Sequence, residues 1–128
     1  MTAILTRCRA LPGRGDEVAA LLAEYQRHVR MEPGCRYFGA ARDPEDPDRF
    51  VLFEQYHSPD ALDEHLASAH HQEIATGRIG ALLAERRATR PLLLANPPYG
   101  RRATAAGAEP AALLAQVLPG FAGWRFGL

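Results

Sequence analysis

The stretch Arg49-Phe-Val-Leu-Phe-Glu-Gln-Tyr-His57 is the clearest strand pattern in the chain. Side chains of a strand alternate between the two faces of its sheet. One face therefore holds Phe50, Leu52, Glu54 and Tyr56, and the other holds Val51, Phe53, Gln55 and His57. Because both faces carry large apolar groups, we expect helices over one face and a second sheet or a second subunit over the other.

Proline and glycine residues divide the chain before this strand into three expected elements. A strand is expected over Thr2–Leu11, a helix from about Val18 to Met31, and a strand over Cys35–Arg42. Asp16 is a candidate N-cap for the helix, because its carboxylate can accept a backbone N–H. The segment Asp43–Asp48 is acidic and holds two prolines, so it predicts a turn between two strands.

The residues after the strand at 49–57 predict paired helices and a closing strand. Ser58 is a candidate N-cap, and Pro59 suits a first helical position. A second helix is expected from about His70 to Ala84, with Ile74, Leu82 and Leu83 inside, and a closing strand at Pro91–Ala95. The inner face of the first helix would hold Ala61, Leu62, His65 and Leu66. This order of elements is that of an α+β subunit with the split β-α-β, ferredoxin-like arrangement.

The character of the chain changes after Asn96. Residues 1–96 read as one domain, residues 97–109 as a linker rich in Ala, Gly and Arg, and residues 110–128 as a C-terminal helical and aromatic extension that holds the single Trp. We expect this extension to pack across a dimer or near the mouth of a pocket. A terminus docked on the surface or frayed is the alternative.

The charge balance argues against a nucleic-acid-binding domain. The 128 residues carry 15 basic and 15 acidic side chains, for a formal net charge of +0, whereas such domains usually show a basic excess. No apolar stretch approaches the roughly 18 residues of a membrane span, so we expect no membrane partner and a cytoplasmic location. Cys8 and Cys35 have no metal-ligand spacing, so reduced thiols are expected.

Three motifs together resemble the antibiotic biosynthesis monooxygenase family, especially its small quinol monooxygenase members. They are the turn Glu32-Pro-Gly-Cys35, the strand ending Phe53-Glu-Gln-Tyr56, and the helix junction His65-Leu-Ala-Ser-Ala-His70. The resemblance covers about residues 1 to 96. It implies a dimeric α+β barrel, in which two ferredoxin-like subunits pack sheet on sheet. Each subunit of such a homodimer has a ligand pocket between its own sheet and helices.

The resemblance also implies an activity. The family includes enzymes that add oxygen to electron-rich aromatics without flavin, haem or metal, and enzymes that oxidise small quinols. The substrate anion must then pass an electron to O₂ itself, so the protein needs a base, hydrogen bonds to the anion and a dry cavity. We therefore expect no cofactor, O₂ as co-substrate, and a small aromatic or quinol as ligand.

His65 is the best candidate for the base, because its spacing from Ala61 and Leu62 places it on the buried helix face and an imidazole titrates near neutrality. Glu54 could orient that imidazole or share the proton, and Tyr56 could supply a ring wall and a phenol hydrogen bond. The residues expected to contact the ligand are His70, His71, Tyr37 and Leu52.

Other interpretations of these residues remain open. His65 could be a hydrogen-bonded core residue, and Glu54 a buried carboxylate satisfied by arginine or backbone donors. The domain could be a non-catalytic dimeric ligand-binding or stress-associated protein, or an O₂-independent isomerase or degradase of a small metabolite. We expect no metal site, because His65 and His70 lie five residues apart across a helix break and His-Glu-x-x-His is absent. Haem breakdown is disfavoured, because no Asn occurs before Asn96.

Overall fold

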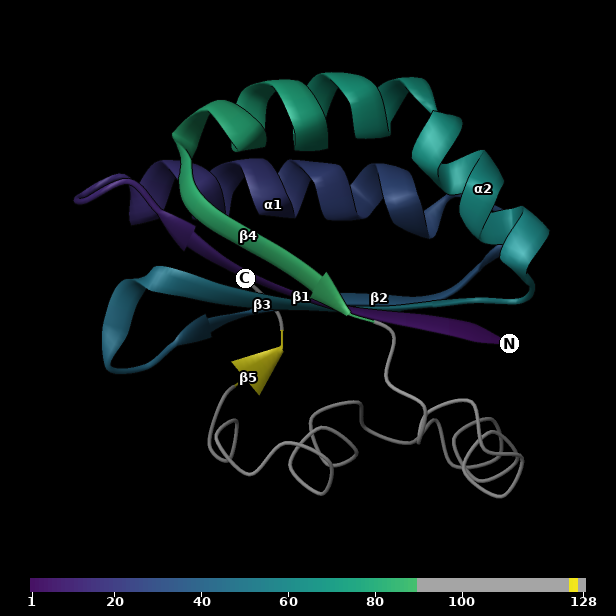
Figure 1. Ribbon diagram of the computed structural model, residues 1–128, viewed down its shortest axis with the longest axis horizontal. Helices are drawn as coiled ribbons and strands as arrows, with labels where there is room; N and C mark the ends of the chain where they lie inside the picture. Colours follow the sequence, from purple (N-terminus) through teal and green to yellow (C-terminus); the bar gives the residue numbers. More distant parts are fainter. Residues whose placement is uncertain (90–124, 127–128) are drawn as a thin grey trace.

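A single antiparallel sheet with helices over one face forms the structure, a computed structural model that describes residues 1–89 and the backbone of residues 125–126 (Figure 1). The sheet order is β4-β1-β3-β2-β5. The elements are β1 (Thr2–Ala10), α1 (Gly15–Arg30), β2 (Cys35–Asp43), β3 (Asp46–Tyr56), α2 (Pro59–Ala67), the π-helix η1 (His71–Ile79), the 3₁₀ helix η2 (Gly80–Leu82), β4 (Leu83–Thr89) and β5 (Arg125–Phe126). The α+β, ferredoxin-like prediction is confirmed.

Strand β3 lies at the centre of this sheet and contains most of the strand predicted at 49–57. In the register, Glu54 stands opposite Ile4 on β1 and Phe38 on β2. Helix α1 buries Val18, Leu22, Tyr25 and Val29 over the face that carries Phe38, Phe50 and Leu52. Burial of each large apolar side chain contributes about 1.5–3 kcal/mol, so this layer supplies much of the driving force for folding.

The opposite face of the sheet is also apolar. Leu5, Val51 and Phe53 are buried there, and the ring of Tyr37 lies 6.0 Å from that of Phe53. Figure 1 shows the described helices on the other side of the sheet. The alternation of side chains along β3 is therefore as expected, with both faces shielded from water.

The expected N-cap of the first helix is wrong. Helix α1 begins at Gly15 rather than near Val18, and Asp16 points outward, with its side chain 94% exposed and its carboxylate 2.8 Å from Arg42. The cap comes instead from Asp48 on β3, whose two carboxylate oxygens accept the N–H groups of Gly13 and Gly15 at 3.1 and 3.0 Å. The hairpin can approach this closely because Gly15 has no side chain.

The expected second helix also differs. Residues from His71 form a π-helix, a 3₁₀ turn follows, and Leu83, expected inside the helix, begins strand β4. Gly77 and Gly80 fall in this region and weaken a regular α-helix. Ile74 is buried as expected, whereas Leu82 and Leu83 are half-buried. The Ser58 cap is confirmed, because its side chain accepts the N–H of Ala61 at 3.1 Å and Pro59 follows.

Several sequence predictions fall outside the described residues. These are the closing strand at Pro91–Ala95, the linker at 97–109 and most of the 110–128 extension. The backbone of Arg125 and Phe126 pairs with Arg42 and Ala41 and adds a short strand to the β2 edge. No helix in the described part of the chain is long and apolar enough to span a membrane. Cys8 and Cys35 are free thiols on strands that β3 separates.

We predict that Asp48→Ala lowers the free energy of unfolding by about 1 kcal/mol, because the N–H of Gly15, the first residue of α1, and that of Gly13 before it lose their acceptor. For a domain of this size the melting temperature falls by about 4–8 °C. Asp16→Ala is the matched control and changes stability by less than about 0.5 kcal/mol, because its carboxylate is exposed. Thermal melts followed by circular dichroism compare the two variants. Equal losses would contradict the assignment of Asp48 as the cap.

Candidate functional site

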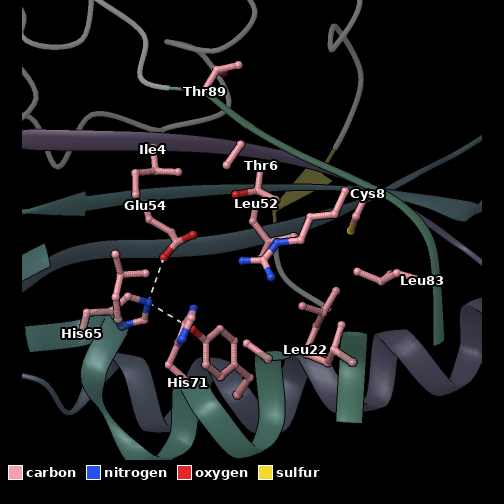
Figure 2. Close-up of a pocket in the computed structure, with 16 residues that line it drawn as sticks. Ile4, Thr6, Cys8, Leu22, Leu52, Glu54, His65, His71, Leu83 and Thr89 are labelled. Carbon is pink, nitrogen blue, oxygen red and sulfur yellow. Dashed lines mark hydrogen bonds and ion pairs between the residues drawn. The ribbon is translucent and has the colours of Figure 1, made fainter. Parts of the chain in front are cut away.

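A cavity of about 260 Å³ lies between the sheet and the helices. Its volume is slightly below the roughly 300–1,000 Å³ range of ligand pockets. Figure 2 shows strand residues above the cavity and helix residues below it. Most lining residues are apolar, and Glu54, His65 and His71 lie near one another among them. The lining residues are Ile4, Thr6, Cys8, Leu22, Tyr25, Leu52, Glu54, His65, Leu66, His71, Ala75, Ile79, Leu83, Arg86, Ala88 and Thr89.

His65 enters this cavity from α2 and is 2% exposed. Ser68 closes the helix, because its N–H and its hydroxyl both donate to the His65 carbonyl, at 3.1 and 2.6 Å. On the imidazole, Nδ1 lies 2.8 Å from Glu32 Oε2, and Nε2 lies 3.0 Å from the hydroxyl of Tyr25. Both ring nitrogens therefore have partners, and the ring orientation is fixed.

Glu32 decides the tautomer of His65. An ionised carboxylate only accepts hydrogen bonds, so Nδ1 carries the imidazole proton and donates it to Glu32. Nε2 is then the basic nitrogen and accepts from Tyr25. The same Glu32 oxygen also contacts His70 Nε2 in a short hydrogen bond. One carboxylate oxygen thus ties the loop after α1 to α2 and to the start of η1.

Glu54 faces His65 from strand β3 (Figure 2), with Oε1 3.5 Å from His65 Nε2. The Tyr56 hydroxyl donates a 2.6 Å hydrogen bond to the same Oε1 atom. Burial raises the pKa of Glu54, although the Tyr56 hydrogen bond and His65 oppose this shift. Burial also raises the pKa of Tyr56, and the Glu54 carboxylate raises it further, so Tyr56 stays protonated as a donor. Glu54 is therefore placed to share a proton with His65.

His71 brings an unused hydrogen-bonding atom to the cavity. Its side chain is buried, and Nδ1 has no hydrogen-bond partner among the described residues. Burial lowers the pKa of His71 to about 4, with smaller contributions from His65 and Arg86. The ring is therefore neutral at pH 7, and an unpaired polar atom in an apolar cavity can be satisfied by a ligand.

Arg86 supplies positive charge from strand β4. It lines the cavity, and its charge counts among the smaller influences that lower the pKa of Glu54. None of the ion pairs in the described residues involves Arg86. A cation without a carboxylate partner beside a small cavity can hold a ligand anion.

The structure brings most of the expected site residues together. Leu52, Glu54, His65 and His71 line the cavity. Tyr56 and His70 support it from outside, because Tyr56 bonds to Glu54 and His70 bonds to Glu32. Tyr37 lies on the opposite face of the sheet against Phe53 and does not line the cavity. The contact that orients His65 comes from Glu32 rather than from Glu54.

Sequence reasoning missed Glu32, Tyr25 and Arg86. Tyr25 lies on the apolar face of α1, so its pattern predicts a core residue and gives no sign of its hydrogen bond to His65. Glu32 belongs to the Glu-Pro-Gly-Cys turn, whose presence is the one sequence signal for it. The sequence predicts a helix that ends at about Ala84 and a strand from Pro91, so Arg86 falls between the two and could not be assigned to a face of the sheet.

The spacing of His65 and His70 does not exclude a metal site, contrary to the expectation from the sequence. The helix break brings His65 Nδ1 and His70 Nε2 onto the same carboxylate. The ligand atoms of Glu32, His65 and His70 lie within 4.8 Å of one another. These three residues could hold a metal ion.

Comparison with known proteins identifies relatives over most of the described chain. The family model described as antibiotic biosynthesis monooxygenase matches residues 1–77. "Putative monooxygenase Rv0793" of Mycobacterium tuberculosis is 35% identical over 81 residues, which cover 63% of this chain and 78% of that protein.

Two solved structures extend the likeness to the fold. The structure of Rv0793 from Mycobacterium tuberculosis superimposes with a TM-score of 0.62 at 31% identity, over 71% of this chain and 94% of that one. A crystal structure titled as an antibiotic biosynthesis monooxygenase gives a TM-score of 0.66 at 26% identity, over 71% of this chain and 96% of that one.

We predict that both thiols are slow to alkylate in the folded protein. Burial raises the pKa of Cys8, at the cavity wall, to about 11, and that of Cys35 to about 12. At pH 8, about one Cys8 side chain in a thousand is then in the reactive thiolate form. Alkylation by iodoacetamide should therefore be more than about 100-fold slower than for free cysteine. Mass spectrometry after timed quenching measures both sites, with Cys35→Ala isolating Cys8. Unfolding should release both thiols, and native rates equal to those of free cysteine would contradict this environment.

Proposed function

The chain belongs to the antibiotic biosynthesis monooxygenase family, and from that premise we propose that it is a cofactor-independent monooxygenase or quinol oxidase acting on a small phenolic or polycyclic aromatic. One observation carries the proposal beyond the family name. A mostly apolar cavity holds the buried side chains of His65 and Glu54 near each other, each with a fixed hydrogen-bond partner. Such a site suits removal of a proton from an aromatic hydroxyl in the absence of water.

The base in this proposal is His65 Nε2. Glu32 keeps the proton of the neutral imidazole on Nδ1, which leaves the Nε2 lone pair on the cavity side. The Tyr25 hydroxyl, which donates to Nε2, must move away when a ligand hydroxyl binds there. The phenol proton moves to Nε2, and the imidazolium that forms lies between two carboxylates, Glu32 and Glu54. Both carboxylates stabilise that charge, which favours the proton transfer.

The resulting phenolate would reduce O₂ directly. For a quinol, two electrons and two protons pass to O₂, and the products are the quinone and H₂O₂. For oxygenation of a ring CH₂ carbon, one atom of O₂ becomes the new carbonyl oxygen, and the other leaves as water with the two hydrogens. In both cases the protein's part is to hold the anion. Arg86, which forms no ion pair within the described residues, and the Nδ1 atom of His71 are placed for it.

The size of the cavity supports a small ligand and the absence of a large organic cofactor. About 260 Å³ suits a molecule of one to a few rings and not flavin or haem in addition to a substrate. We therefore propose O₂ as co-substrate, with no flavin or haem required for turnover, and the family resemblance extends this proposal to turnover without a metal ion.

A second candidate function is ligand binding without catalysis. The observation that favours it is the internal satisfaction of the network, because Tyr25 occupies His65 Nε2 and Tyr56 occupies Glu54. A protein of this kind would bind an aromatic in the cavity without turnover. An isomerase or degradase that uses His65 without O₂ is a further alternative. Both alternatives predict no oxygen consumption.

We predict that His65→Gln lowers kcat for quinol or polyphenol oxidation by about 100- to 10,000-fold, the range typical of losing a general base. Glutamine retains hydrogen-bonding capacity toward Glu32 but cannot accept the proton. Oxygen consumption with a panel of quinols, in buffer containing EDTA, measures the effect. His57→Gln is the matched control, because His57 is exposed after β3, and it should keep the wild-type rate. A wild-type rate in His65→Gln, or no oxygen uptake by the wild type with any quinol, would refute the proposal.

We also propose that the chain is a homodimer joined through the face of the sheet opposite the helices. Val51, Phe53 and Gln55 are buried in the single chain, so their burial does not by itself require a second subunit. The support is the apolar character of a face that no described helix covers, together with the dimeric barrel that the family resemblance implies.

Light scattering should therefore give a mass of twice 14.0 kDa. Phe53→Glu places a charge in this face and should yield monomers or insoluble protein, because an unpaired buried charge is costly. As a control, Glu45→Gln, at the exposed hairpin turn, should leave the dimer intact. A stable monomer for the wild type would contradict the proposed homodimer.

A further inference from the structure

We propose that Glu32, His65 and His70 form a binding site for a divalent transition-metal ion of the Zn²⁺ type, and that the bound ion shuts off the base. The three donor atoms, one carboxylate oxygen and two imidazole nitrogens, lie within 4.8 Å of one another. Two of them, His65 Nδ1 and His70 Nε2, already converge on Glu32 Oε2.

The donor set matches the chemistry of zinc. Imidazole nitrogen and carboxylate oxygen bind Zn²⁺ at about 2.0–2.2 Å, and two histidines with one glutamate are a known ligand combination. Donors of a tetrahedral ion at these distances lie about 3.3 Å apart. His65 Nδ1 and Glu32 Oε2 are 2.8 Å apart, so this pair has to separate by about 0.5 Å to admit the ion. Three protein ligands leave a fourth position for water.

The donors are held in place before any ion arrives. Ser68 fixes the junction between α2 and η1, because its hydroxyl donates to the His65 carbonyl and accepts the His71 N–H. The second nitrogen of His65 faces Tyr25 at 3.0 Å and Glu54 at 3.5 Å, and the ring of His70 stacks on that of His28. Outer contacts of this kind orient histidine ligands in metal sites.

The charge of the cluster also favours a dication. Glu32 and Glu54 bring two carboxylates close to His65, and among the described residues no arginine forms an ion pair with either of them. The basic groups in ion-pair distance of these carboxylates are imidazoles, and the Arg86 charge, which also acts on Glu54, lies beyond that distance. A divalent ion would compensate this negative charge.

An ion can reach the cluster from solvent. The side chains of His70 and Glu32 are 20% and 15% exposed, whereas that of His65 is 2% exposed. The cluster therefore lies between the surface and the cavity, with His70 on the outer side. Metal entry through His70 does not require the cavity to open.

The effect on His65 follows from its tautomer, and this step rests on the proposed function. A metal ion on Nδ1 replaces the proton there, and the neutral ring then carries its proton on Nε2. Nε2–H can only donate, toward Tyr25 or Glu54, so it no longer accepts a proton from a phenol. Occupancy by Zn²⁺ should therefore inhibit turnover.

The binding test uses the full chain after EDTA treatment and removal of the chelator. Titration with Zn²⁺ by calorimetry, and with Co²⁺ by visible absorption, should show one site per chain. Glu32→Gln and His70→Gln should each weaken Zn²⁺ binding by more than the roughly 10- to 100-fold loss typical of an outer-shell substitution. His57→Gln, which removes an exposed histidine, should bind as the wild type does. The two test variants alter different elements, and thermal melts identify any variant that fails to fold.

Absence of saturable binding in the wild type, or binding that survives both substitutions in folded protein, would overturn the site. Loss of binding in a folded variant, with His57→Gln unaffected, supports it. Oxygen consumption measured in parallel should fall as Zn²⁺ occupancy rises, and the fall should be absent in His70→Gln. If binding follows the prediction while turnover is unchanged, the site stands and the inhibition is refuted. If EDTA removes activity and Zn²⁺ restores it, the site stands and the cofactor-free function is refuted.

Discussion

The site depends on one carboxylate oxygen, Glu32 Oε2, which accepts hydrogen bonds from both His65 and His70. Glu32 lies in the loop between α1 and β2, whereas the histidines lie at the two sides of the α2–η1 junction. This contact therefore joins two segments that are distant in sequence. It also places the proton of His65 on Nδ1, and the base proposed for the cavity is the lone pair on Nε2, which accepts from Tyr25 until a ligand arrives.

A buried polar cluster of this kind is costly unless each member has a partner. The structure meets this requirement in pairs, with Tyr56 donating to Glu54 and Tyr25 facing His65. Among the residues that the structure describes, Nδ1 of His71 is the exception within the cavity. The satisfied pairs fix the positions of the acid–base groups, and the unsatisfied atom marks where a ligand would make its hydrogen bond. The surrounding apolar side chains strengthen each of these interactions by excluding water.

Much of the fold was predictable from local patterns. The alternation along β3 correctly places Glu54 on the helix-covered face, and Ser58-Pro59 correctly marks the start of α2. The wrong predictions share a physical cause, because they depend on contacts between distant residues. Asp48, which lies on strand β3, caps α1, whereas the local sequence around α1 predicts Asp16 as the cap. The π-helix and the start of β4 at Leu83 depend on packing over the sheet, which overrides the periodicity of residues 70–84. The spacing of residues along the helix and the strand was enough to place His65 and Glu54 on buried faces. The role of Glu32 could not be predicted in this way, because it depends on the fold that brings Glu32 to His65.

The most direct test of this account is the tautomer of His65 in the metal-free protein, measured from the ¹⁵N chemical shifts and couplings of its imidazole ring at neutral pH. The account predicts a protonated Nδ1 that is hydrogen-bonded to Glu32 and an unprotonated Nε2, with the proton preference relaxed in Glu32→Gln. A proton on Nε2 in the wild-type protein would contradict it, because no base would then face the cavity.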